Sequence, residues 1–180
     1  MQAVKTILIL GGESTGKSTL AEVLAAHYQT VWVPEYARTY LDNLPGDYTL
    51  ADLSEIAIGQ LSLEEILLPT ASKFLFCDTG IDVICWWSAQ RFGLIDEALL
   101  NARSAPHYDA VLVTAPDLEW QPDPQREHPN PTDRERFFNH FVGVAEKSGK
   151  PFVIIRGQGD DRLHSAIAFL NEQFSEHDLN

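Results

Sequence analysis

Short apolar runs alternate with amphipathic stretches along the chain. Apolar runs are typical of strands buried on both faces, whereas apolar positions that recur every three or four residues are typical of helices. The runs that predict strands are 6–10, 31–33, 73–78, 108–113 and 151–155. The stretches that predict helices are 20–28, 50–68, 81–92, 94–102, 134–147 and 160–174. Because strands and helices alternate, we expect an α/β fold with a five-stranded parallel sheet, right-handed crossovers and helices on both faces.

A helix cap and a long proline-rich loop mark further boundaries. Thr49 and Asp52 are spaced as in a capping box and predict the start of the helix that ends before Pro69. Residues 116–133, the proline-rich loop, hold five prolines among charged residues. Long loops in compact domains are often functional, so we expect a lid here. Because the length suits one hydrophobic core, we expect a single domain over residues 1–180.

The first predicted strand leads into a glycine-rich stretch with the pattern of a phosphate-binding P-loop. The stretch reads Gly11-Gly12-Glu13-Ser14-Thr15-Gly16-Lys17-Ser18-Thr19, and it lies between a strand and a helix as the motif requires. In such a loop, backbone N–H groups and the helix N-terminus surround the phosphates. We expect Lys17 to bind the β- and γ-phosphates and the Ser18 hydroxyl to bind Mg²⁺. The sequence therefore predicts a site for ATP and Mg²⁺.

The acidic composition excludes some classes of partner. The chain has 13 Lys and Arg residues against 26 Asp and Glu residues, a net charge of −13. A negative surface binds nucleic acid and anionic membranes poorly, so we expect a small-molecule substrate and neither of these partners. Cys77 and Cys85 lack the spacing of a metal site or a disulfide framework. Without a signal peptide or a membrane-spanning apolar run, the sequence predicts a cytoplasmic protein.

Two carboxylates follow predicted strands, at the sheet edge where α/β proteins bind ligands. Asp78 ends the strand 73–78, so it is a candidate for the acid that holds Mg²⁺ in P-loop proteins or for the base that accepts an acceptor's proton. The alternative is that it caps the next helix. Glu35 follows the strand 31–33 and is a candidate for the base or for a ribose ligand, unless it only forms a surface ion pair with Arg38.

Three arginines lie in or just after the proline-rich loop of this acidic protein. In phosphoryl transfer, a mobile loop can bring arginines onto the phosphates and exclude water. Arg126 lies in the middle of the loop and is the predicted phosphate contact, whereas Arg134 and Arg136 begin a helix and are candidates for surface charges. Glu13, inside the P-loop, is expected to be a solvated acid.

Aromatic residues near these acids are candidates for a base-binding surface. Tyr36 follows Glu35, Trp86 and Trp87 lie in the helix after Asp78, and Trp120 lies in the proline-rich loop. Aromatic side chains also pack in protein cores, and core packing is the alternative for each of them.

Taken in order, these motifs resemble the ribosylnicotinamide kinase domain of bacterial NadR-type proteins. The resemblance rests on residues 7–20, 35–38, 56–60 and 78–79, and on Trp120 followed by Asp123 and Arg126. It implies the fold of nucleoside and nucleotide kinases, a three-layer P-loop NTPase sandwich with a lid. It also implies an ATP-dependent kinase that phosphorylates the 5′-hydroxyl of nicotinamide riboside, a step of NAD salvage.

The motifs and the resemblance together assign residues to the two sides of the site. The predicted catalytic residues are Lys17, Asp78, Glu35 and Arg126, and the predicted acceptor-binding residues are Glu35, Tyr36, Arg38, Trp86 and Trp87. The pyridinium ring of nicotinamide riboside is a fixed cation, which aromatic faces and acidic groups favour. The segment 123–126 reads Asp-Pro-Gln-Arg where the family usually has Asp-Gly-x-Arg. Because the resemblance starts at the first strand, we expect no adenylyltransferase or DNA-binding domain.

Two other functions remain open at this stage. A nucleotide-dependent switch or ATPase needs no acceptor, but a GTPase would normally carry an Asn-Lys-x-Asp motif, which the sequence lacks. A kinase for a different nucleoside would differ only in its acceptor pocket. The sequence decides neither the oligomeric state nor which of Asp78 and Glu35 is the base.

Overall fold

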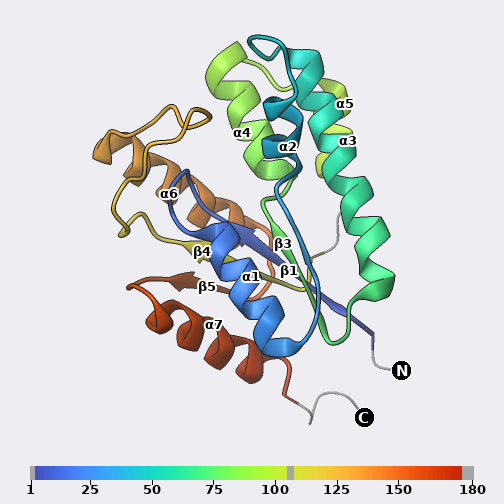
Figure 1. Ribbon diagram of the computed structural model, residues 1–180, viewed down its shortest axis with the longest axis vertical. Helices are drawn as coiled ribbons and strands as arrows, with labels where there is room; N and C mark the ends of the chain where they lie inside the picture. The colour runs from blue at the N-terminus through green and yellow to red at the C-terminus, as the bar shows by residue number, and fades with distance from the viewer. Residues whose placement is uncertain (1–2, 105–107, 176–180) are drawn as a thin grey trace.

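A parallel sheet forms the centre of the computed structural model, which describes residues 3–104 and 108–175 (Figure 1). Within these residues the strands are β1 (Lys5–Leu10), β2 (Trp32–Val33), β3 (Phe74–Asp78), β4 (Ala110–Thr114) and β5 (Phe152–Ile155). Their order in the sheet is β2-β3-β1-β4-β5, and every neighbouring pair is parallel. The predicted five-stranded parallel sheet is confirmed.

The helices follow the predicted periodicity, with corrections at their starts. They are α1 (Lys17–Tyr28), α2 (Tyr36–Asp42), α3 (Leu50–Leu67), α4 (Ile81–Phe92), α5 (Glu97–Arg103), α6 (Pro131–Lys147) and α7 (Asp160–Gln173), and a short 3₁₀ turn, Leu68–Thr70, follows α3. The capping box of Thr49 and Asp52 is present at the start of α3. Helix α2 was not expected from the sequence.

Capping side chains explain two helix starts that the sequence analysis placed wrongly. Helix α5 begins at Glu97 and not near residue 94, because the Asp96 side chain accepts the Leu99 N–H at 2.8 Å. Helix α6 begins at Pro131, because the Asn130 side chain caps it and proline suits the first helical position. The proline-rich loop therefore ends at residue 130, and residues 131–133 belong to α6.

Helices cover both faces of the sheet. The apolar sides of α1 and α7 pack on one face, and α6 packs on the other together with parts of α3 and α4. A third apolar cluster joins α3, α4 and α5, which lie with α2 at the top of Figure 1. None of the described helices has both the length and the apolar character needed to cross a membrane.

The parallel sheet brings the predicted site residues to one edge. The P-loop follows β1, Glu35 follows β2 closely, Asp78 ends β3, and the proline-rich loop follows β4. Because Ile9 pairs with Asp78 and Leu10 pairs with Val113, these strands end at nearly the same level. Segments far apart in sequence therefore meet at the carboxyl edge, where open α/β sheets bind ligands.

Gly59 allows α2 to pack closely on α3, and this contact gives a first testable prediction. An alanine Cβ at Gly59 would lie 2.1 Å from Cε1 of Tyr36, so the Gly59→Ala substitution overpacks the contact. We expect the free energy of unfolding in urea to fall by about 1–3 kcal/mol. The control is Gly143→Ala in α6, where, apart from the backbone of its own helical turns, no atom of the described residues would lie within 4 Å of the new Cβ. That variant should be as stable as wild type or more so by up to about 1 kcal/mol; equal losses in both would contradict the prediction.

Candidate active site

The P-loop has a backbone that only glycine permits at its first position. Gly11 has a φ of +158°, and a Cβ there would lie 2.1 Å from the Thr114 hydroxyl at the end of β4. The Thr114 hydroxyl is hydrogen-bonded to the Thr15 hydroxyl at 2.7 Å, and it donates to the Leu10 carbonyl at 3.1 Å. The loop is therefore fixed to the neighbouring strand by two buried hydroxyls.

The same loop places a lysine and a helix N-terminus together. Gly16 is the N-cap of α1 with a φ of +77°, and Ser14 also has a positive φ of +54°. Lys17 Nζ donates to the Gly12 carbonyl at 3.0 Å. The ammonium group thus lies over the loop, where it can reach an anion that the loop's N–H groups bind.

A pocket of about 430 Å³ lies in front of the P-loop. It contacts the loop from Gly11 to Thr19, the beginning of α2, the end of β3, one side of α4 and the middle of the proline-rich loop. Of the predicted site residues, Glu35, Arg38, Asp78, Trp86, Trp87 and Arg126 all line it. Trp32 of β2 also lines it and was missed by the sequence analysis, although it lies in the predicted strand 31–33, three residues before Glu35.

Asp78 is a buried carboxylate, and the nearby Lys17 charge offsets only part of the cost of burying it. It is 1% exposed, and neither carboxylate oxygen has a hydrogen-bond partner within the described chain. Burial raises its pKa to about 6; the Lys17 charge opposes the rise and the Glu35 charge adds to it. The next residue, Thr79, has a φ of +74° and a buried hydroxyl that is also unpartnered. Such strain and unsatisfied polarity concentrate at functional sites.

The chemistry of these groups fits a magnesium ion. Mg²⁺ prefers oxygen ligands and usually takes one or two from the protein, the rest being water and phosphate. The Asp78 carboxylate and the Ser18 hydroxyl, both in the pocket lining, supply such oxygens. In the described part of the chain, no group of three or more His, Cys, Asp or Glu side chains is arranged to hold a metal by itself. A metal here would therefore depend on the phosphates as well.

The acceptor-side predictions divide between the pocket and its surroundings. Glu35 is the N-cap of α2 and lines the pocket. Arg38 forms its ion pair with Asp123, at 2.9 Å. Among the described residues, the surface ion pair between Glu35 and Arg38 that was the alternative for Glu35 is therefore not found. Tyr36 is not part of the pocket lining. Its ring lies against Gly59, and its N–H donates to the Gln60 side chain at 2.9 Å.

The two tryptophans of α4 sit between the pocket and other rings. Trp86 lies 3.9 Å from His140 between ring centroids, and its buried indole N–H has no partner among the described residues. Trp87 stacks on His128 of the proline-rich loop at 5.3 Å with an interplanar angle of 19°. Trp120, the fourth aromatic candidate, is not part of the pocket lining, and its ring centroid lies 5.7 Å from Cζ of Arg134.

Glu13 is not the solvated acid that the sequence analysis expected. Its carboxylate accepts the backbone N–H groups of Glu127 and His128 at 3.0–3.1 Å. Burial raises its pKa, and the two N–H groups oppose the rise. The Ser14 hydroxyl also accepts the Gln121 N–H at 2.9 Å. The proline-rich loop is thus bound directly to the P-loop.

The three arginines in and just after the proline-rich loop differ in what they contact. Arg126 lines the pocket and donates to the Gln121 carbonyl. Arg134, which we expected at the surface, donates instead to the carbonyls of Ser14 at 3.2 Å and Leu118 at 3.0 Å. Arg136 has a half-exposed side chain that reaches Asp133 and Gln90.

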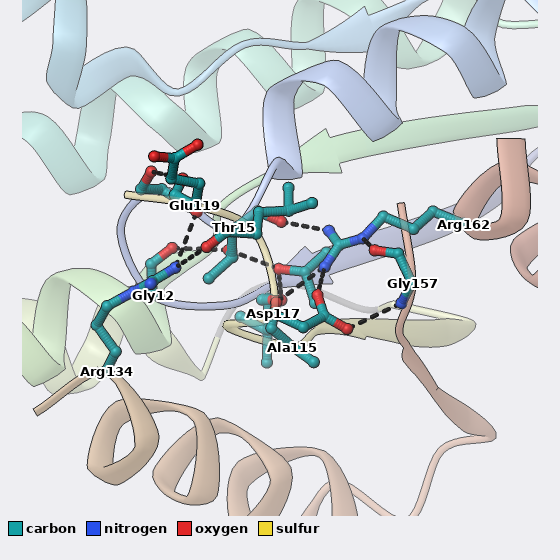
Figure 2. A network of polar contacts seen from close by, with 12 residues as sticks. Gly12, Thr15, Ala115, Asp117, Glu119, Arg134, Gly157 and Arg162 are labelled. Atoms are coloured by element: carbon teal, nitrogen blue, oxygen red, sulfur yellow. Dashed lines mark hydrogen bonds and ion pairs between the residues drawn. The ribbon is translucent and has the colours of Figure 1, made fainter. Parts of the chain in front are cut away.

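A further arginine, Arg162 of α7, was missed by the sequence analysis. It is 5% exposed and donates to the Thr15 carbonyl of the P-loop. Figure 2 shows Arg162 and Arg134 approaching the P-loop from opposite sides. The sequence offers no local signal for this role, because Arg162 is 147 positions from Thr15.

Comparison with known proteins agrees with this geometry. A family model described as an AAA domain matches residues 6–162. The chain belongs to this family. Together with the five-stranded parallel sheet and the solved structures described below, this match confirms the α/β P-loop NTPase fold predicted from the sequence.

Two curated relatives are the trifunctional NAD biosynthesis/regulator proteins NadR of Escherichia coli and Salmonella typhimurium. Each is 29% identical to this chain, and the match covers 96% of this chain. The chain spans 43% of the length of these relatives. The resemblance to NadR-type proteins is therefore confirmed across nearly the whole chain.

Solved structures with the same fold include NadR and a thymidylate kinase. NadR in complex with NAD and AMP-PNP has a TM-score of 0.77 and 23% identity, covering 95% of this chain and 50% of that one. NadR in complex with NR has a TM-score of 0.78 and 24% identity, covering 95% and 52%. Thymidylate kinase from Candida albicans has a TM-score of 0.66 and 14% identity, covering 96% and 92%. At these identities the likeness establishes the fold.

The buried charge of Asp78 gives a second testable prediction. Its pKa of about 6 exceeds the ordinary value of 3.8, so the folded state keeps a proton that the unfolded chain has lost. Stability should therefore fall as pH rises from about 4 to about 6 and then level off. In Mg²⁺-free buffer, Asp78→Asn should be more stable than wild type above pH 6 by on the order of 2–3 kcal/mol, and should lose this advantage near pH 4.

Urea unfolding at several pH values measures this difference. The control is Asp47→Asn, which removes a charge from a side chain that is 95% exposed. We expect that variant to follow the wild-type pH profile. A stability difference for Asp78→Asn that is the same at pH 4 and pH 8 would show that the buried charge is not its cause.

Proposed function

We propose that this chain is an ATP-dependent nucleoside kinase that transfers the γ-phosphate of ATP to the 5′-hydroxyl of nicotinamide riboside. The observation that carries the proposal is one pocket that joins the P-loop to two strand-end carboxylates and two tryptophans. A P-loop alone supports nucleotide binding, whereas carboxylates and aromatic faces opposite it supply what an acceptor nucleoside needs. The NadR relatives, named for NAD biosynthesis, support the same assignment.

The nucleotide side of the reaction belongs to the P-loop and the proline-rich loop. N–H groups of residues 11–19 would bind the phosphates, and Lys17 would place its charge on the transferred group. Arg126 would add a second positive charge from the proline-rich loop, and that loop would act as a lid that excludes water. Ser18 and Asp78 would hold Mg²⁺, which neutralises charge on the phosphate oxygens.

The acceptor side belongs to the two carboxylates. We assign Asp78 to the reaction centre, because it ends β3 as a buried carboxylate in the pocket that also contains the P-loop lysine. Glu35 is assigned to binding the acceptor ribose, because it stands at the start of α2 on the pocket wall. Positioning and charge stabilisation then account for most of the catalysis, as in other phosphoryl transfers.

The choice of nicotinamide riboside rests on its permanent positive charge. A pyridinium ring gains from aromatic faces through cation–π attraction and from nearby carboxylates. Trp86 and Trp87 supply the rings, and Glu35 and Asp78 supply the acids, in a protein of net charge −13. NadR has been crystallised with NR bound in the same fold, which supports this choice. A neutral nucleoside would gain less from this combination.

Removing the P-loop lysine tests the nucleotide side. Lys17→Ala should abolish ATP turnover while leaving the unfolding free energy within about 1 kcal/mol of wild type, because the side chain serves the ligand and makes only one hydrogen bond to its own loop. Turnover is measured by coupled ADP release with acceptor present. Lys73→Ala, remote from the pocket lining, is the control and should retain full activity. A Lys17→Ala enzyme as fast as wild type would contradict the P-loop assignment.

A panel of acceptors tests the substrate. With ATP fixed, we expect kcat/KM for nicotinamide riboside to exceed that for uridine and adenosine by at least about tenfold, the size of one cation–π contact. Nicotinic acid riboside, which adds a carboxylate to the same cationic ring, tests whether net charge matters. Equal or better use of uridine or adenosine would leave a kinase for another nucleoside. ATP consumption that no acceptor stimulates would instead indicate a nucleotide-dependent switch or ATPase.

A further inference from the structure

Arg162 is a buried cation that the proposed reaction does not use. It lies in the first turn of α7, its side chain is 6% exposed, and it is not part of the pocket lining. A positive charge near a helix N-terminus is unfavourable, because the helix dipole is also positive there. Burial adds a large desolvation penalty to that repulsion. The position therefore requires strong compensating contacts.

Those contacts come from three segments, two of which are distant from Arg162 in sequence. Arg162 donates to the Thr15 carbonyl of the P-loop through Nη1 and to the Ala115 carbonyl through Nη2, the latter at 2.9 Å. Its Nε donates to the Gly157 carbonyl at 2.8 Å, between β5 and α7. Nη2 also pairs with Asp117 at the start of the proline-rich loop.

Asp117 closes these contacts into a ring. One of its oxygens accepts from Arg162, and the other accepts the Gly157 N–H at 2.8 Å, while the Gly157 carbonyl accepts from Arg162. Figure 2 shows the guanidinium between Asp117, Gly157 and Thr15. Each member thus fixes the other two, which is the arrangement that compensates a buried charge.

The guanidinium also packs against the point where the P-loop enters α1. A Cβ on Gly16 would lie 3.3 Å from Arg162 Nη1 and 2.9 Å from Cδ1 of Leu118, so both side chains pack closely against this glycine. The Thr15 hydroxyl is bound to Thr114 on the strand side. The peptide between Thr15 and Gly16, one of those that direct N–H groups toward a phosphate, is therefore held by its carbonyl.

We propose that Arg162 is a positioning residue for nucleotide binding. From outside the pocket it fixes the phosphate-binding shape of the P-loop, and through Asp117 it joins that shape to the base of the proline-rich loop. The inference rests on the proposed function only in taking the P-loop as the nucleotide site. It assigns no role to Arg162 in binding the acceptor, because α7 lies on the opposite face of the sheet from α4.

Nucleotide affinity measures this role directly. Arg162→Lys keeps the charge but loses the planar group that donates in several directions at once. We expect the Kd of magnesium AMP-PNP, measured by calorimetry, to rise about tenfold or more. The KM for ATP should rise alike, while the KM of the acceptor that wild type uses best should stay within about twofold. A general loss of stability would not raise the KM for ATP while leaving the KM of the acceptor unchanged.

The control is another arginine–aspartate pair. Arg103→Lys weakens the 2.6 Å contact of Arg103 on α5 with Asp82 on α4, and neither residue lines the pocket, so the variant should leave the Kd of AMP-PNP unchanged. Asp117→Asn is the second test variant, because it opens the ring but leaves the guanidinium in place. It should raise the same Kd, by less than Arg162→Lys does.

The outcomes separate the inference from the proposed function. If wild type does not bind AMP-PNP, the proposed function fails. If wild type binds and Arg162→Lys binds equally well, or if the KM values of both substrates rise together, the positioning role is overturned. If Arg162→Lys does not fold, Asp117→Asn decides, and an unchanged Kd in that variant overturns the inference.

Discussion

The close approach of Gly11 to Thr114 is the contact on which the rest of the site depends. No side chain fits between them, since a Cβ would lie 2.1 Å from the threonine hydroxyl. The P-loop therefore leaves β1 directly against the end of β4, and the two threonine hydroxyls fix it there. Because the proline-rich loop begins immediately after β4, the same contact determines where that loop starts relative to the phosphates.

Local patterns predicted most of the fold, because the signals for strands and helices lie within each element. The apolar run before Asp78 and the glycines of the P-loop identify a strand end and a phosphate loop without any tertiary information. Parallel pairing then brings Asp78 and Glu35 to one edge as a consequence of topology. Helix α2 was missed because its seven residues have no buried position of their own and depend on packing against α3.

The remaining site residues could not be predicted, because their partners are remote in sequence. Glu13 binds N–H groups 114 and 115 positions away, and Arg162 binds a carbonyl 147 positions away. In both cases a charged side chain binds backbone atoms, which carry no residue-specific signal. A sequence shows which residues are charged, whereas only the fold shows which backbone groups they satisfy.

The proline-rich loop connects the two sides of the pocket through different kinds of contact. On the P-loop side its backbone is bound by Glu13, and on the α2 side, where we propose that the acceptor binds, Asp123 pairs with Arg38. Helix α2 in turn begins at Glu35 and is fixed to α3 by Gln60 through the Tyr36 N–H. A displacement of the loop would therefore move a contact to the P-loop and a contact to α2 together. This geometry gives one loop the means to make binding on one side depend on binding on the other.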